Sequence, residues 1–139
     1  MVEFLQENWV LLVGLVVIAA FTFKGPILMR LSGVGSVDAP GAVRLINQQD
    51  AKVVDVREDK EWRQGHIPGA VHIPLGQLPG RMDELEPYRN TGSPLVVACR
   101  SGNRSANAAV QLRKAGFQPV YNLSGGTMGW QQSGMPLEE

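Results

Sequence analysis

The sequence predicts an α/β fold in which a parallel sheet carries helices on both faces, preceded by one N-terminal transmembrane helix. From Ser36 onward, short apolar runs typical of buried strands alternate with helical stretches, and this alternation favours a parallel sheet. The first thirty residues contain a long apolar run without charge. A chain of 139 residues is long enough for one domain with a core, but not for two.

The N-terminal segment has the composition of a membrane-spanning helix. Residues 9–23 carry no charge, and as a helix they would span about 22 Å, somewhat less than the roughly 30 Å hydrocarbon core. Including Phe4 and Leu5, and letting Lys24 reach back to the interface, extends the predicted transmembrane helix to residues 4–24. A secretory signal, a buried core helix and an interfacial helix fit less well. The start is acidic, and the run is apolar on every face.

Charges flanking this segment predict its orientation. Lys24 and Arg30 follow the apolar run, whereas no basic side chain precedes it. Because positive charge stays in the cytoplasm, we expect a single-pass membrane protein whose main domain faces the cytoplasm. Residues 25–35 are rich in Gly, Pro and Ser and are predicted to be a linker, and residues 36–139 are predicted to be the domain.

Within the domain, each element follows from a local pattern. Asp38 can cap a helix that carries Val43, Leu45 and Ile46. Apolar runs predict strands at residues 52–56, 70–73, 95–98 and 119–122. Helices are predicted at residues 58–64, 106–116 and 128–132, with a broken helix over 75–85. In open parallel sheets ligands bind at the carboxyl ends of strands.

The only cysteine stands at such a strand end, in the segment Cys99-Arg100-Ser101-Gly102-Asn103-Arg104-Ser105. Backbone N–H groups and the dipole of the following helix favour negative charge at this turn. Together with the two arginines they should lower the pKa of the Cys99 thiol and give a reactive thiolate at neutral pH. A single cysteine excludes an internal disulfide. The chain has no second thiol that could accept a group bound to Cys99. Such a group must therefore be transferred to another molecule.

Three segments, in this order, resemble the signatures of the rhodanese family. The first is Asp55-Val56-Arg57 with Glu61-Trp62 and Gly65-His66-Ile67-Pro68-Gly69-Ala70, and the second is the cysteine segment itself. The third is Val120-Tyr121-Asn122-Leu123-Ser124-Gly125-Gly126, followed by Gly129-Trp130 and Gly134-Met135-Pro136. The resemblance covers roughly residues 36–138. It implies a rhodanese-like five-stranded parallel sheet flanked by helices and a catalytic cysteine that carries sulfur as a persulfide.

The predicted function is therefore sulfur transfer. Cys99 would take the outer sulfur of thiosulfate, or of a similar small donor, and pass it to a thiophilic acceptor such as cyanide or a protein thiol. Backbone N–H groups of the loop would surround the anionic sulfur, and the two arginines would hold the sulfonate. The predicted substrate-binding residues are Arg100, Ser101, Gly102, Asn103, Arg104 and Ser105.

Neither a metal nor a cofactor is predicted. His66 and His72 lack further ligands beside them. Asp55 and Arg57 are expected to hold loops together. Because 13 basic residues balance 13 acidic ones, a nucleic-acid partner is not predicted.

Two other functions remain as alternatives. Cysteine phosphatases place arginine six positions after the cysteine, where this chain has Ser105, and the shorter loop goes with sulfur transfer in the rhodanese family. The second alternative is a membrane-tethered rhodanese-like module that binds a protein partner at the membrane rather than transferring sulfur. Persulfide formation on Cys99 would separate an enzyme from such a module.

Overall fold

The computed structural model describes residues 1–23, 27 and 29–139. Lys24, Gly25, Pro26 and Leu28 lie outside the described residues. The expected interfacial role of Lys24 and the first part of the predicted linker therefore lie outside them too.

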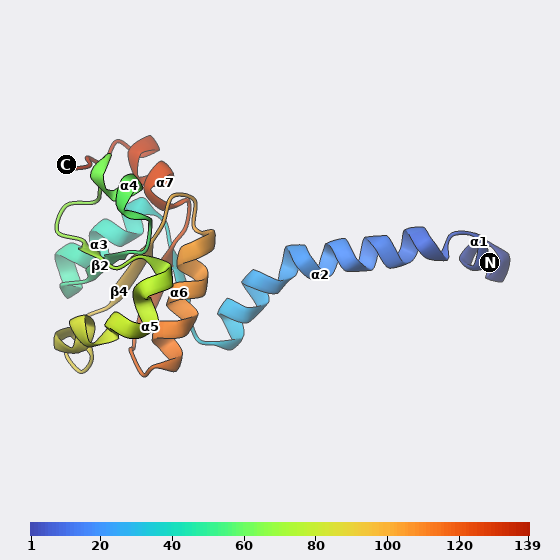
Figure 1. Cartoon of the computed structure of the whole chain (residues 1–139), viewed down its shortest axis with the longest axis horizontal. Helices are drawn as coiled ribbons and strands as arrows, with labels where there is room; N and C mark the ends of the chain where they lie inside the picture. Colours follow the sequence, from blue (N-terminus) through green and yellow to red (C-terminus); the bar gives the residue numbers. More distant parts are fainter.

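A five-stranded parallel sheet forms the centre of the domain (Figure 1), as predicted. The strands lie in the order β1-β5-β4-β2-β3. Their bounds are Gly35–Val37 for β1, Lys52–Asp55 for β2, Val71–His72 for β3, Leu95–Ala98 for β4 and Val120–Leu123 for β5. Every neighbouring pair is parallel. Only β1 lacks a counterpart among the predicted strands, because its three residues form no apolar run.

Helices cover both faces of the sheet. One face carries α3 (Ala39–Gln49) and α7 (Gly126–Gln132). The other face carries α5 (Leu78–Arg81), the 3-10 helix η2 (Met82–Tyr88) and α6 (Asn103–Lys114). The remaining elements are α4 (Asp59–Arg63) and the 3-10 helix η1 (Leu75–Gln77). Asp38 caps α3 as expected, since its Oδ1 accepts a hydrogen bond from the Gly41 N–H at 2.8 Å.

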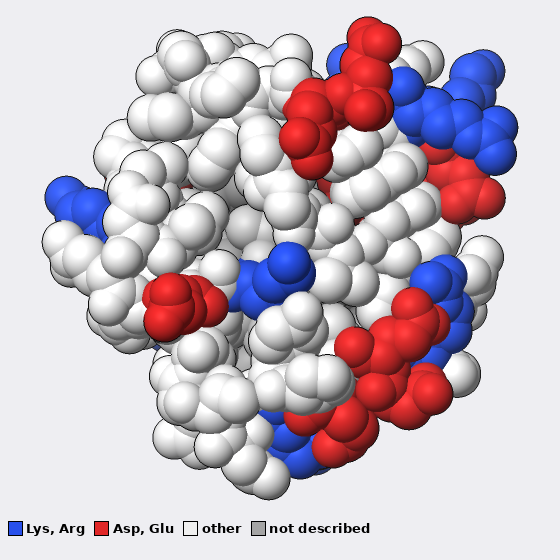
Figure 2. Space-filling model, turned by 90° about the vertical axis from the view of Figure 1, so that its left-hand side faces the viewer, with Lys and Arg blue, Asp and Glu red and all other residues white. Residues whose placement is uncertain are grey.

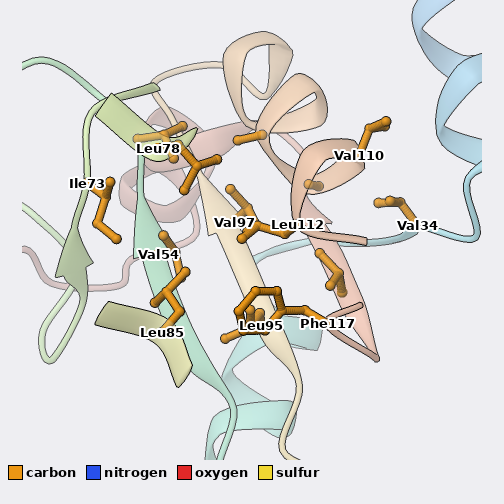
Figure 3. Packing of buried hydrophobic residues seen from close by; sticks show 14 of the residues in the cluster. Val34, Val54, Ile73, Leu78, Leu85, Leu95, Val97, Val110, Leu112 and Phe117 are labelled. Carbon is orange, nitrogen blue, oxygen red and sulfur yellow. The ribbon is translucent and has the colours of Figure 1, made fainter. Parts of the chain in front are cut away.

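The two core clusters follow the alternation of side chains along the strands. In β4, Val96 and Ala98 point to the α3 and α7 face. Leu95, Val97 and the following Cys99 belong to the cluster on the α6 face. Figure 3 shows Leu95 and Val97 close to Leu112 of α6 and to Phe117, packed as one cluster. The position of Cys99 is thus fixed by the packing of the central strand.

The N-terminal segment forms α1 (Val2–Glu7) and α2 (Trp9–Leu31), and α2 extends away from the domain in Figure 1. Among the described residues, no helix combines the length and the apolar character needed to cross a membrane. Asn8 separates the two helices, so residues 4–7 and α2 do not form one continuous helix. This finding contradicts the predicted transmembrane helix at residues 4–24. The predicted single-pass membrane location, with the domain facing the cytoplasm, is therefore wrong.

Candidate active site

The cysteine loop joins the central strand β4 to α6 at the carboxyl edge of the sheet. β4 lies between β5 and β2, so the ends of all three strands meet at this edge. Gly102 takes the left-handed conformation, with φ of 108°, as the N-terminal cap of α6. A Cβ at this position would lie 3.4 Å from the Leu123 carbonyl oxygen. Glycine therefore allows the loop to curl back over the sulfur and pack against β5.

The Cys99 sulfur is buried inside this loop, with the residue only 1% exposed. The Gly102 N–H donates a hydrogen bond to Sγ at 3.1 Å, and the Ser105 hydroxyl lies 3.3 Å from Sγ. Burial raises the pKa of the Cys99 thiol, but hydrogen bonds from the Ser105 hydroxyl and from the loop N–H groups lower it by more. The resulting pKa lies below the ordinary value, mainly because of the donors of the loop rather than the arginines.

Asn122 holds the Ser105 hydroxyl in place. The Ser105 Oγ donates to Asn122 Oδ1 at 2.6 Å, and Asn122 Nδ2 donates to the Gly102 carbonyl at 3.1 Å. The second bond fixes the orientation of the amide, so its oxygen must face Ser105. Ser105 has a single hydroxyl hydrogen, so the Asn122 oxygen competes for it with the Cys99 sulfur. The sequence did not single out Asn122, although a polar residue in the apolar strand β5 was a usable signal.

Arg104 forms an ion pair with a carboxylate and is not a free cation beside the sulfur. Its Nη1 and Nη2 donate to the two carboxylate oxygens of Glu61, at 2.6 and 2.8 Å. The hydrogen bond with Arg104 lowers the pKa of Glu61 to about 2, and Glu61 in turn raises the pKa of Arg104. Glu61 also accepts the Glu58 N–H at 3.2 Å at the start of α4. Arg104 therefore connects the cysteine loop to α4.

The ion pair of Asp55 and Arg57 is buried at the end of β2. The Arg57 Nε and Nη2 donate to the Asp55 carboxylate at 2.8–3.0 Å, and Nη2 also donates to the Gly65 carbonyl at 2.8 Å. These bonds join the strand end to the loop after α4. The geometry agrees with the expected role in holding loops together.

A cavity of about 270 Å³ lies beside the cysteine loop. Its lining includes Arg57, Glu61, Gln64, Arg100, Thr127 and Gln131. The backbone N–H groups of Thr127 and Met128 donate to the carbonyls of Cys99 and Arg100, at 2.8 and 3.1 Å. α7 is therefore attached directly to the chain segment that carries the thiol, and it forms one wall of the cavity.

The remaining predicted site residues lie at different depths. Arg100, Ser101 and Asn103 are exposed, whereas Gly102 and Ser105 are buried. Among the described residues, no carboxylate forms an ion pair with Arg100. Arg100 is thus the arginine of the loop that is available to an incoming anion.

Next to the site, Trp62 lies between the two histidines. Its ring stacks on His66 with centroids 3.5 Å apart and on His72 with centroids 4.6 Å apart. Nitrogen atoms of both rings also contact the backbone: His66 Nδ1 lies 3.1 Å from the Trp62 carbonyl, and His72 Nε2 lies 2.7 Å from the Arg57 carbonyl. These contacts fit an ordering role for the rings.

On the face of the domain shown in Figure 2, acidic and basic side chains are interspersed. No large area of that face carries a single sign of charge. This arrangement matches the balanced composition of the chain.

Known proteins are similar to this chain in sequence or in fold. A sulfurtransferase of Allochromatium vinosum is 38% identical over 94 residues, which are 68% of this chain and 84% of that protein. An uncharacterized protein of Synechocystis is 41% identical over 100 residues, covering 70% of this chain but 53% of that protein, so the chain spans about half of its length. The crystal structure of a thiosulfate sulfurtransferase from Pseudomonas aeruginosa aligns with a TM-score of 0.70 at 29% identity. That alignment covers 84% of this chain and 22% of the other.

The chain also matches a whole protein family. Residues 39–133 match the family described as the rhodanese-like domain. The matched range includes β2, the cysteine loop, Asn122 and α7. The chain belongs to the rhodanese-like domain family.

Proposed function

We propose that this chain is a sulfurtransferase that moves the outer sulfur of thiosulfate through a Cys99 persulfide to a thiol or cyanide. The observation that carries the proposal is the environment of the Cys99 sulfur, which is buried and accepts the Gly102 N–H at 3.1 Å. Fixed backbone donors stabilise an anionic sulfur in both of its forms, the thiolate and the persulfide.

The reaction takes two displacement steps. In the first, the Cys99 thiolate attacks the outer sulfur of thiosulfate. A new S–S bond forms, the S–S bond of thiosulfate breaks, and sulfite leaves with the electron pair. In the second, the acceptor attacks the outer sulfur of the persulfide, and the bonding pair returns to Cys99 as thiolate. Both steps transfer an electron pair with the leaving group, so no external oxidant or reductant is consumed.

The residues of the loop have distinct proposed roles. Exposed Arg100 binds the sulfonate of thiosulfate, because Arg104 is already paired with Glu61. Arg104 acts as a positioning residue for the loop. The backbone N–H groups of Ser101 to Ser105 surround the transferred sulfur. The names of the Allochromatium and Pseudomonas relatives, a sulfurtransferase and a thiosulfate sulfurtransferase, agree with this proposal.

Mass spectrometry of the intact, purified chain tests the proposal directly. Incubation with thiosulfate should add one sulfur atom to the protein, and cyanide should then remove it as thiocyanate. Cys99→Ser should abolish both the added mass and the turnover while leaving the circular dichroism spectrum unchanged. Full transfer by the Cys99→Ser protein would contradict the proposal. A folded wild-type chain that never gains sulfur would instead favour a binding module.

A further inference from the structure

Arg57 has one nitrogen that the Asp55 ion pair leaves unused. Its side chain donates hydrogen bonds through Nε and Nη2, to Asp55 and to the Gly65 carbonyl. Arg57 itself is only 5% exposed. In the described part of the chain, no buried side-chain nitrogen or oxygen lacks a partner. Nη1 has no hydrogen-bond partner among the described residues, so it cannot be fully buried and must reach open space.

That open space is the cavity of about 270 Å³, which Arg57 lines. Exposed Arg100 lines the same cavity. The only carboxylate in the lining, Glu61, is already paired with Arg104. The remaining polar groups are the amides of Gln64 and Gln131 and the Thr127 side chain. The lining therefore presents two guanidinium groups and neutral donors, which suits an oxyanion.

The size and place of the cavity indicate which reactant it holds. Its volume is close to the lower limit of about 300 Å³ for pockets that bind small organic ligands, so it offers more room than the five heavy atoms of thiosulfate need. Its α7 wall is hydrogen-bonded to the carbonyls of Cys99 and Arg100. A molecule bound there lies directly beside the segment that carries the sulfur.

We propose that this cavity binds the carboxylate of a small thiol acceptor, with Arg57 and Arg100 as its ligands. The inference rests on the proposed sulfur transfer and specifies the acceptor class. The bound thiolate attacks the outer sulfur of the Cys99 persulfide and forms a new S–S bond. The bond between that sulfur and Cys99 breaks, and its electron pair returns to Cys99. The product is the persulfide of the acceptor.

Two thiols that differ in their carboxylates test the specificity. Mercaptosuccinate carries two carboxylates, whereas 2-mercaptoethanol carries none. Arg57→Lys retains a cation for Asp55 but removes Nη1, and it should lower the ratio of kcat/KM for mercaptosuccinate over mercaptoethanol about tenfold, as expected for a lost charged hydrogen bond. The same substitution at exposed Arg44, on α3, should leave this ratio unchanged. Equal losses for both thiols would overturn the proposal.

A second variant keeps the test valid if Arg57→Lys does not fold. Gln131 is exposed on α7 and lines the cavity, so Gln131→Ala should lower the same ratio about threefold. If this variant instead raises the KM for thiosulfate and leaves the ratio of the two thiols unchanged, the cavity binds the donor. That result would overturn the acceptor assignment.

Binding measured without catalysis separates this inference from the proposed function. Succinate should bind to the Cys99→Ser protein in calorimetric titrations, and the added Arg57→Lys change should weaken binding about tenfold. If succinate binds but the wild-type protein never gains sulfur, the proposed sulfur transfer is rejected and the cavity assignment is not. If sulfur is transferred but succinate does not bind, the cavity assignment is rejected and the sulfur transfer is not.

Discussion

The guanidinium of Arg104 and the carboxylate of Glu61 form a two-point ion pair, with N–O distances of 2.6 and 2.8 Å. The two residues lie 43 positions apart in the sequence. The pair joins the first turn of α6 to α4, so the cysteine loop and the edge of the cavity are held as one unit. We therefore expect the loss of this ion pair to change the stability of the protein more than its substrate binding.

Glu61→Gln should destabilise the protein in a pH-dependent way. The pKa of Glu61 is about 2 in the folded chain, against an ordinary value of 4.5, mainly because of its hydrogen bond with Arg104. Because the folded value is the lower one, the stabilisation is fully present above pH 4.5 and is lost as the pH falls toward about 2. The variant should lose about 1 kcal/mol of unfolding free energy at pH 7, the upper range for a partly exposed pair. Urea titrations from pH 7 to pH 3 should show the two proteins converging, and a difference independent of pH would contradict this.

Arg100→Ala and Arg104→Ala should have different kinetic effects. Loss of Arg100 removes an unpaired cation and should raise the KM for thiosulfate about tenfold with little loss of stability. Loss of Arg104 should raise this KM less and should lower the urea midpoint, because it removes the contact with Glu61. Steady-state kinetics at several thiosulfate concentrations would measure both. A larger KM effect from Arg104 would reverse the assigned roles.

Asn122→Leu should make the Cys99 thiol more acidic. Without the Asn122 Oδ1, the Ser105 hydroxyl hydrogen is free to bond the thiolate, and this bond lowers the thiol pKa further. The rate of iodoacetamide alkylation at pH 6 should rise about two- to fivefold. In a Ser105→Ala background the Asn122 change should have no such effect. An equal increase in that background would show that Ser105 does not transmit it.

Gly126→Ala should be the most damaging glycine substitution near the site. Gly126 has φ of 60°, and a Cβ there would clash with the carbonyl oxygens of Cys99 and Arg100. The combined strain and overpacking should cost about 3 kcal/mol or more. Gly134 has φ of 80° but open space around its Cβ position, so Gly134→Ala should cost about 1 kcal/mol. Equal urea midpoints for the two variants would contradict the steric argument.

Local patterns in the sequence were enough to predict most of the sheet and the position of Cys99 at the end of a strand. The apolar run at residues 95–98 and the helix behind it place Cys99 at a strand end, and the structure has β4 and α6 there. The strand β1 is fixed instead by its pairing with β5, and such a contact leaves no periodic signal in three residues. The N-terminal apolar run predicted a membrane-spanning helix, and the described residues contain none.

The partners within the site were harder to predict, because they come from distant parts of the chain. Arg104, which was predicted to bind the sulfonate, is paired with Glu61, and nothing in the loop itself indicates this pair. Asn122 reaches Ser105 only because β5 lies beside β4. Arg57 was correctly expected to hold loops together. Its place in the lining of a cavity depends on the packing of α4 and α7.

The burial of the single cysteine also makes its reactivity a measure of correct folding. The donors around the sulfur come from the loop, and Asn122 and Gly126 support that loop from β5 and α7. In a chain whose sheet is incomplete, the same thiol lacks these groups and titrates as an ordinary cysteine. Alkylation at mildly acidic pH would therefore count the native molecules in a mixed population, and each chain contributes one signal.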